Sequence, residues 1–450
     1  MTSYRQALEL IFQRANFERQ AQPPYSERVY RLERMRELLQ AVGNPQDRCQ
    51  SVHIAGTKGK GSVTAFTESI LRAAGYRTGM YTSPHLHTFR ERIRVMGQPA
   101  SEEQIRTWME RLYPVLTARP EVTVFEAITA LAMIGFAESG IQFGVFEVGM
   151  GGRLDATNIL EPLVSVITPV SLDHINVLGN TIAAIAYEKA GIIKPNTPVV
   201  SSPQTDEALQ VIRQTCAQRD APLTYVPDVW HWQLRSSDLW QQTFTLAHID
   251  AEAEMLLQIP LLGEHQLENA SAAVATIAVL RERGYGISDQ AIKTGLESVV
   301  WPGRMEVLGQ NPLVVVDGAH NGHSIERLLA ALRTYLHYHR VILIFGVSST
   351  HTPLDLLQAI AAVADSLILT QSIHSKAHPV ADLATYARSL GYQPQIGSTV
   401  AQSMELALAN IQPDDLVLVT GSLFVVAEAR AAWLVRNGLP PPLGDPEGIY

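Results

Sequence analysis

The sequence has few cysteines, few aromatic residues and no long hydrophobic run. Only Cys49 and Cys216 are cysteines among 450 residues, which excludes a disulfide-rich scaffold and favours a reducing compartment. No apolar stretch approaches the roughly 20 residues that a membrane-spanning helix needs. The first residues carry charges where a signal peptide would have an apolar core. We therefore expect a cytoplasmic protein without a membrane partner.

Positive charge is also in short supply. The chain has 35 Lys and Arg against 44 Asp and Glu, a formal net charge of −9, whereas nucleic-acid-binding proteins usually have a basic surplus. We therefore expect no nucleic-acid partner. Hydrophobic residues make up 46% of the chain and charged residues 18%, so the chain can bury a core, and its length favours two domains.

Short apolar stretches that alternate with helical patterns predict an α/β fold. The expected strands of the first half are residues 51–55, 78–82, 143–148, 163–168 and 198–201. Helical patterns such as 127–138 and 182–190 lie between them. This alternation is typical of a mostly parallel sheet that is covered on both faces. The stretch 226–258 is richer in polar residues and predicts an antiparallel extension.

The same alternation begins again after a boundary that we place between residues 298 and 299. The expected strands of the second half are residues 313–316, 341–345, 366–370 and 416–420. The sequence therefore predicts a first domain of residues 1–298 and a smaller, Rossmann-like α/β domain of residues 299–450. The tail from Pro440 onward begins with three consecutive prolines and is expected to be loose.

A glycine-rich loop follows the first expected strand and precedes a helical pattern. The loop reads Gly56-Thr57-Lys58-Gly59-Lys60-Gly61-Ser62. Glycines let several backbone N–H groups point at one anion, and the positive end of the following helix supports the same charge. Lys60 would reach the outer phosphates of a nucleotide, with Gly59, Gly61 and Ser62 around them. The loop departs from the GxxxxGK[ST] pattern, because Ile54 stands at the first glycine's position. The alternative is a glycine-rich turn without a ligand.

Four further segments carry polar residues where expected strands end or helices begin. They are residues 82–86, 146–158, 171–174 and 188–191. In an open parallel sheet such positions meet in one crevice. Glu147 ends an apolar strand, where a buried carboxylate is costly unless a cation compensates it. Magnesium, which prefers oxygen ligands, would fit. The alternative is an ion-paired core residue.

Together with the glycine-rich loop, these segments resemble the dihydrofolate synthase/folylpolyglutamate synthase family, which is related to the Mur ligases. The resemblance extends over nearly the whole chain and implies a P-loop, Mur-ligase-like first domain. It also implies an ATP-dependent amide ligase. ATP would phosphorylate a carboxylate of dihydropteroate or of a folate polyglutamate, and L-glutamate would then displace the phosphate. We expect a monomer that binds small molecules.

The resemblance also assigns a metal site. Ser83, Glu147 and His174 would contact Mg²⁺. Lys189 would be a catalytic residue, carbamylated by CO₂ so that it becomes an anion that supports a magnesium ion. Carbamylation needs a neutral amine, and burial lowers the pKa of a lysine. A surface lysine paired with Glu188 or with another carboxylate is the alternative.

Residues around and beyond the boundary would hold the nucleotide. By resemblance, Asn269 contacts the adenine side of ATP and Arg304 reaches its phosphates. Asp317 and His320 lie close to the nucleotide, and His320 takes part in catalysis. An arginine at a hinge bridges two domains only when they close, and closure would exclude water.

The sequence gives the weakest indication for the acceptor site. The resemblance places the pterin-bearing substrate near Phe125, Glu126, Leu154, Asp155 and Ala156. Phe125 would stack on a flat ring, and Glu126 would accept hydrogen bonds from it. Both are also ordinary residues at the start of a helix. The choice between dihydropteroate and a folate with existing glutamates stays open.

Three other functions are weighed against this one. A ligase that acts on a peptidoglycan precursor would usually carry a separate domain for its UDP-sugar. A P-loop NTPase would hydrolyse ATP without a carboxylate substrate and would give Lys189 no role. A nucleotide-binding protein without catalysis would not need the whole set of Lys60, Glu147, His174 and Lys189. Lys58 stands where bacterial members of the family often have asparagine, which leaves the substrate preference open.

Overall fold

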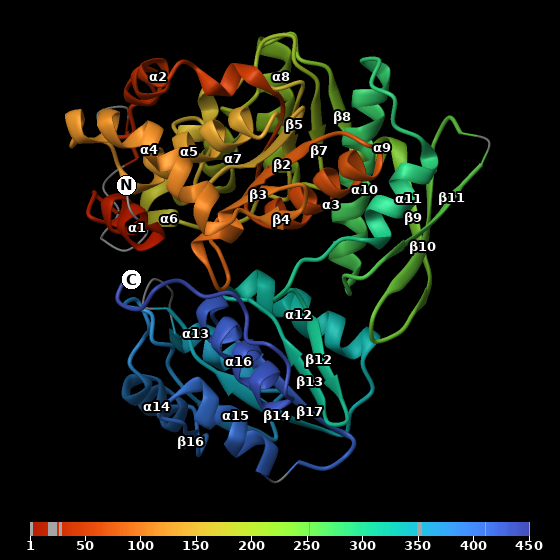
Figure 1. The fold of residues 1–450 in the computed structure, drawn as a ribbon. Coiled ribbons are helices and arrows are strands. Elements are labelled where there is room, and N and C mark those ends of the chain that lie inside the picture. Colours follow the sequence, from red (N-terminus) through yellow and green to blue (C-terminus); the bar gives the residue numbers. More distant parts are fainter. Residues whose placement is uncertain are drawn as a thin grey trace.

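The computed structural model describes residues 3–16, 25–26, 29–251, 253–348, 353–409 and 411–449. Two layered α/β parts lie one above the other in Figure 1, and the chain crosses between them near residue 300. The predicted α/β class is therefore confirmed. Among the described residues, no helix combines the length and apolar character that crossing a membrane needs.

The first part is built on an eight-stranded sheet with β1 (Gln50–Ala55) inside it. β1 pairs in parallel with β5 (Phe143–Glu147) on one side and with β6 (Val164–Ile167) on the other. Outward from these lie β2 (Thr78–Tyr81), β3 (Ile93–Val95) and β4 (Gln98–Pro99) beyond β5, and β7 (Val199–Ser201) and β8 (Leu223–Tyr225) beyond β6. Only the pairs β2–β3 and β3–β4 of this sheet are antiparallel. The central strand is buried from Ser51 to Ala55, which fits the apolar run that predicted it.

Helices cover both faces of this sheet and form separate cores with it (Figure 1). One core contains α3 (Lys60–Ala73), α10 (Glu264–Glu282) and α11 (Asp289–Glu297). The other contains α1 (Tyr4–Phe12), α2 (Leu32–Ala41), α4 (Glu102–Ala118) and α5 (Val124–Glu138). A third, smaller core holds α7 (Ile182–Ala190) and α8 (Asp206–Gln218). The inner strands β5, β1 and β6 therefore lie between packed layers of helices, which hold their carboxyl ends in place.

Hydroxyl side chains fix where two of these helices begin. The Ser101 side chain accepts the N–H of Gln104 at the start of α4, and the Thr123 side chain accepts the N–H of Glu126 at the start of α5. In both helices the third residue reaches back to the N–H of the cap. This reciprocal cap satisfies donors that the first helical turn leaves without partners. It holds the first turn of α5, with Phe125, in one place.

A small antiparallel sheet extends the first part, as predicted for residues 226–258. β10 (Gln242–His248) pairs with β9 (Trp230–Ser237) and with β11 (Met255–Ile259). Phe244 and Leu246 alternate with more exposed residues and pack into the core that contains α10.

The second part is a six-stranded sheet between two layers of helices. Its order is β12 (Glu306–Gln310), β13 (Leu313–Val316), β17 (Asp415–Thr420), β14 (Arg340–Phe345), β15 (Ser366–Leu369) and β16 (Gln395–Ile396). Only β12 pairs antiparallel within this sheet. One core holds α12 (Gly322–Tyr335), α13 (Pro353–Ala361) and α14 (Val380–Ser389), and the other holds α15 (Val400–Ala409) and α16 (Leu423–Arg436). The predicted Rossmann-like arrangement is therefore confirmed, and every strand predicted in the two large sheets agrees within one residue at either end.

The tail after α16 differs from its prediction. The expectation that the chain is loose from Pro440 onward is wrong for residues 445–449, which return to the first part. Figure 1 shows the C label close to α1 and the N label. Ile449 is only 8% exposed and packs into the core that contains α1. The reason is tertiary, because the partners of this segment lie more than 350 residues away in the chain.

The division between residues 298 and 299 falls in the connection from α11 to β12. It stays a prediction. The return of residues 445–449 to the first part means that the end of the predicted second domain does not pack only with its own sheet.

Candidate active site

The loop from β1 to α3 bends where glycine is required. Gly59 has a φ of 85°, a region that other residues rarely adopt. A Cβ atom on Gly59 would lie 2.3 Å from Asn269 Oδ1, and one on Gly61 would lie 2.7 Å from Trp301 Cζ2. The small residues therefore let the α10 asparagine and the tryptophan before the second part lie directly against this loop.

Each lysine of the loop is paired with a carboxylate. Lys60 Nζ lies 3.8 Å from Glu147 Oε1 at the end of β5, and Lys58 Nζ lies 3.2 Å from Asp173 Oδ2. The Ser83 N–H donates to Glu147 Oε2 at 3.2 Å. Burial raises the pKa of Glu147, and the nearby Lys60 ammonium opposes that rise. Three of the predicted residues, Ser83, Glu147 and Lys60, are thus joined by direct contacts.

Ser83, Glu147 and His174 offer a hydroxyl, a carboxylate and an imidazole. His174 begins the short helix α6 (Ile175–Leu178). Burial lowers the pKa of His174 although Asp173 favours its charged form, so the ring tends toward the neutral state that a metal ligand needs. Within the described ranges, no cluster of three or more His, Cys, Asp or Glu side chains is arranged to hold a metal ion. A hydroxyl, a carboxylate and an imidazole leave room for phosphate and water oxygens, which Mg²⁺ keeps among its ligands.

Lys189 lies in the last turn of α7 and is buried. It is 4% exposed, and its Nζ donates to Gly56 O at 2.8 Å. Burial, together with the positive charge of Lys60, lowers the pKa of Lys189 to about 7. Glu188 pairs instead with Arg153 at 3.0 Å. The alternative of a surface lysine paired with Glu188 is therefore wrong.

Asp317 and Arg304 come from the second part of the chain and lie next to one another. The Asp317 carboxylate follows β13 and accepts the N–H groups of Met305 and Ala319, both at 2.8 Å. Burial raises the pKa of Asp317, and the Arg304 guanidinium opposes the rise. Arg304 Nη1 donates to Gly303 O at 3.1 Å. The arginine is thus held at the crossing between the two parts.

His320 follows Asp317 by three residues and faces a group of the first part. Its Nδ1 donates to Gly318 O at 2.7 Å, and this nitrogen carries the proton because a carbonyl oxygen only accepts. Burial raises the pKa of Asp173, but the charge of Lys58 outweighs this effect and lowers the pKa, with smaller contributions from His174 and His320. His320 is therefore within electrostatic reach of the Lys58–Asp173 pair.

One cavity of about 1630 Å³ lies between the two parts of the chain. The predicted site residues in its lining are Ser83, Phe125, Glu126, Leu154, Asp155, Ala156, His174, Arg304 and His320. Those outside its lining are Gly59, Lys60, Gly61, Ser62, Glu147, Lys189, Asn269 and Asp317. The cavity exceeds the roughly 300–1,000 Å³ of a typical small-molecule site, so it has room for two substrates.

The predicted acceptor residues already have partners in the protein. Arg34 Nη2 lies 2.7 Å from Glu126 Oε1, and the Thr123 N–H donates to Glu126 Oε2 at 2.8 Å. A Cβ on Gly149 would lie 2.4 Å from the ring of Phe125, so this ring packs directly against the loop that follows β5. Glu126 and Phe125 thus shape the wall of the cavity at this end.

Asp155 holds the loop that follows β5. Its Oδ2 accepts the N–H groups of Gly149 and Met150 at 3.1 and 3.0 Å, and its Oδ1 accepts the hydroxyl of Thr157 at 2.6 Å. Leu154 and Ala156 flank it in the cavity lining. Asp155 therefore stabilises the loop that presents its neighbours.

Sequence reasoning missed two of these partners. Asp173 lies in one of the polar segments described above, but its pairing with Lys58 was not predicted. The opposite charges of the two residues were the available signal. Arg34 gave no such signal, because it lies 92 residues before Glu126.

Comparisons with known proteins agree with this geometry. The model of the Mur ligase middle domain matches residues 54–277, and that of the Mur ligase glutamate ligase domain matches residues 303–423. The probable bifunctional folylpolyglutamate synthase/dihydropteroate synthase of Halobacterium salinarum is 37% identical over 416 residues, covering 88% of this chain. The chain spans 49% of that relative, about half of its length.

Two other similar proteins match along nearly their full length. The dihydrofolate synthase/folylpolyglutamate synthase of Bacillus subtilis is 33% identical over 406 residues, which cover 89% of this chain and 94% of the relative. The structure of Mycobacterium tuberculosis folylpolyglutamate synthase complexed with ADP has a TM-score of 0.84 at 29% identity and covers 98% of this chain and 100% of that chain. The chain therefore belongs to the dihydrofolate synthase/folylpolyglutamate synthase family of Mur ligases.

Proposed function

We propose that this protein is an ATP-dependent ligase that forms an amide bond between L-glutamate and a carboxylate of dihydropteroate or of a folate that already carries glutamates. The observation that carries the proposal is the cavity between the two parts, lined by Ser83 and His174 from one and by Arg304 and His320 from the other. The Mycobacterium tuberculosis relative is described with ADP, which supports ATP as the phosphate donor.

The reaction has two chemical steps. A carboxylate oxygen of the acceptor attacks the γ-phosphorus of ATP, the bond to the β-phosphate oxygen breaks, and ADP leaves. The uncharged α-amine of L-glutamate then attacks the carbonyl carbon of the acyl phosphate. The carbon–oxygen bond to phosphate breaks, the amine loses a proton, and inorganic phosphate leaves the new amide.

Bringing a carboxylate to the γ-phosphate opposes two negative charges. Lys60 and Arg304 would neutralise this charge from the two parts of the chain, in a closed site where fixed charges act more strongly than in water. Gly59, Gly61 and Ser62 would bind the phosphates through the start of α3. Their small size and positive helix end support that role.

The adenine side of the nucleotide would lie near Asn269, which the structure brings against Gly59. Asp317 would bind or orient the nucleotide from the second part. His320, with its Nδ1 proton held by Gly318 O, would offer its other ring nitrogen to the reacting groups.

Magnesium would be held by Ser83, Glu147 and His174, and it would neutralise phosphate charge when bound. Carbamylation of Lys189 would add an anion near this set. The step joins the neutral amine to CO₂, forms a nitrogen–carbon bond and releases one proton. The buried amine with its pKa near 7 supports this modification.

The acceptor would lie along Phe125, Glu126, Leu154, Asp155 and Ala156, all of which line the cavity. Phe125 would stack on the flat ring. Glu126 and Asp155 would mainly stabilise the walls of the acceptor site, since both carboxylates already accept hydrogen bonds from the protein. We propose action as a monomer on small molecules. Its cytosolic location stays a prediction.

One assay tests the proposed function. ADP release is measured with ATP and Mg²⁺, with dihydropteroate or tetrahydrofolate, each with and without L-glutamate. We expect release that requires both an acceptor and L-glutamate, and the preferred acceptor settles which substrate the enzyme uses. Release that is independent of both would instead indicate an NTPase and contradict the ligase.

A further inference from the structure

A carboxylate from the tail accepts three hydrogen bonds from the first part of the chain. Asp445 Oδ1 accepts the hydroxyls of Tyr4 and Thr88, both at 2.6 Å, and its Oδ2 accepts the N–H of Phe89 at 2.7 Å. Hydrogen bonds to a charged acceptor stabilise more than those between neutral groups. One side chain therefore joins the tail to both α1 and the segment after residue 87.

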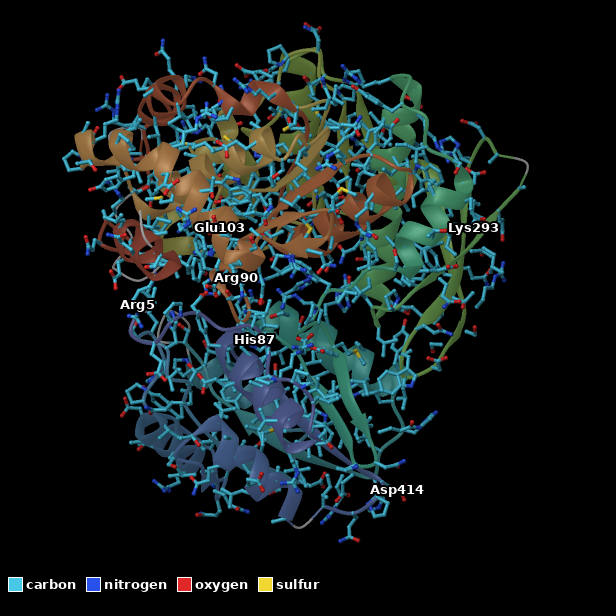
Figure 2. The ribbon with its side chains drawn as sticks, in the orientation of Figure 1. Arg5, His87, Arg90, Glu103, Lys293 and Asp414 are labelled. Carbon is cyan, nitrogen blue, oxygen red and sulfur yellow. The ribbon has the colours of Figure 1, made fainter. Side chains whose placement is uncertain are left out.

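The residues around Asp445 strengthen this attachment. The Arg5 Nη2 donates to Glu447 O at 2.9 Å, and Ile449 is buried in the core that contains α1. In Figure 2, Arg5 lies on the side of the molecule where the tail returns, and His87 lies where the two parts face each other. The attachment is thus a chain of contacts and not a single one.

Asp445 acts on a loop that belongs to the candidate site. Residues 83–88 contain Ser83 and line the cavity up to His87. Glu91 accepts the N–H groups of residues 86–88 at 2.8–3.3 Å, which closes the end of this loop into a turn, η2 (Phe89–Arg92). Asp445 binds the same turn from outside, through Thr88 and Phe89. The tail therefore holds one end of the loop, while Glu147 holds the other through the N–H of Ser83.

The tail is also part of the cavity itself. Asp445, Pro446, Glu447 and Gly448 all line the cavity that contains the predicted acceptor residues. Because they follow α16 of the second part and bind the first, this side of the cavity is lined by a segment that leads from one part to the other.

We propose that Asp445 is a positioning residue of the acceptor site. Through Thr88 and Phe89 it fixes the loop of residues 83–88, and with residues 446–448 it forms a wall against which the acceptor fits. This rests on the proposed function for the identity of the acceptor. The position of the loop does not depend on it.

The first test separates the acceptor from the nucleotide. Asp445→Ala raises the acceptor KM by about tenfold, because it removes hydrogen bonds to a charged group. Since Glu147 still holds Ser83, kcat and the affinity for ATP measured by calorimetry stay within about twofold. Thr88→Val has the same direction with a smaller effect, and Thr88→Ser, which keeps the hydroxyl, behaves like the wild type. Asp414→Ala, an exposed carboxylate of the second part, is the matched control.

The second test needs no substrate. Hydrogen exchange of the peptide that covers residues 83–92 is at least about tenfold faster in Asp445→Ala than in the wild type, because the Phe89 N–H loses its acceptor. Unchanged exchange overturns the proposal, and so does faster exchange with an unchanged acceptor KM in an active enzyme. If the wild type shows no glutamate-dependent turnover, the proposed function fails first, and the acceptor role falls with it.

Discussion

The two ends of the candidate site are built in different ways. At the phosphate end, which lies outside the cavity lining, Lys58 and Lys60 come from the loop that follows β1. Their carboxylate partners come from the end of β5 and from the segment after β6, the two strands that flank β1. At the acceptor end, the walls come from α2, α5, the loop after β5 and the tail, and long-range contacts such as Arg34–Glu126 join them.

The chemistry and the specificity therefore depend on different parts of the structure. The phosphate end is fixed by strand order and short loops, which leaves little room to vary. The acceptor end is fixed by contacts between distant segments, which single substitutions change without disturbing the sheet. We therefore expect substitutions at the two ends to fail in different ways, the first in turnover and the second in stability or acceptor binding.

The sharpest contrast comes from Lys60→Ala. We expect turnover to fall about 1,000-fold, because the γ-phosphate and the carboxylate lose a fixed positive charge in a closed site. The fold stays intact, although the thermal unfolding midpoint falls somewhat because the buried Glu147 loses a cation 3.8 Å away. Steady-state ADP release and circular dichroism measure both quantities.

Lys293→Ala is the control for this loss, since Lys293 of α11 lies outside the cavity lining, and Figure 2 shows it on another side of the molecule from His87. Near-normal turnover of Lys60→Ala would remove the phosphate loop from the mechanism and erase the contrast between the two ends.

Arg34→Met removes the ion pair with Glu126 at the acceptor end. We expect it to destabilise the protein by about 3 kcal/mol, because Glu126 is left as a buried charge without its partner. Arg34→Met combined with Glu126→Gln recovers most of the loss, since glutamine keeps the helix cap while losing the charge. Urea denaturation gives the free energies of unfolding.

Arg436→Met provides the matched control, because the pair of Arg436 with Glu405 is exposed and is worth less than about 1 kcal/mol. A double variant as unstable as Arg34→Met alone would show that the pair is not what holds this wall.

The smallest effect concerns the modification of Lys189. With its pKa near 7, the neutral amine is the minor form at pH 6 and the major form at pH 8. We therefore expect a carbamate signal in ¹³C NMR with ¹³C-bicarbonate that is severalfold stronger at pH 8 and absent from Lys189→Met. A signal that does not change between these pH values, or that survives in the variant, contradicts the assignment.

The same group gives a stability trend when CO₂ is excluded. The folded pKa of Lys189 is lowered from its ordinary 10.5, so the unfolded chain binds one more proton between about pH 7 and 10.5. Its contribution to the free energy of unfolding therefore rises with pH in this window, and Lys189→Met removes that rise.

Most of the fold follows from local sequence. The buried strands are short apolar runs, and their ends agree within one residue because glycine, proline or a capping residue closes them. The residues of the phosphate end could also be predicted from the sequence, since Lys60, Glu147 and Lys189 each lie at one end of a predicted strand or helix. The roles of these residues stay predictions.

The sequence was silent where the partner is distant. The tail looks like a polar, proline-rich end, and nothing near Asp445 indicates that Tyr4, 441 residues earlier, will bind it. The pairing of Arg34 with Glu126 is hidden in the same way, because each residue is ordinary in its own helix. Such contacts depend on how complete layers pack, which no local pattern encodes.

The central claim is that the cavity turns a carboxylate into an acyl phosphate before the amine attacks. Positional isotope analysis tests it most directly. An acceptor whose free carboxylate carries ¹⁸O is converted with ATP, Mg²⁺ and L-glutamate, and the released phosphate is analysed by mass spectrometry. When both carboxylate oxygens carry the label, we expect one ¹⁸O atom in each released phosphate. Amide product accompanied by phosphate without ¹⁸O would contradict it.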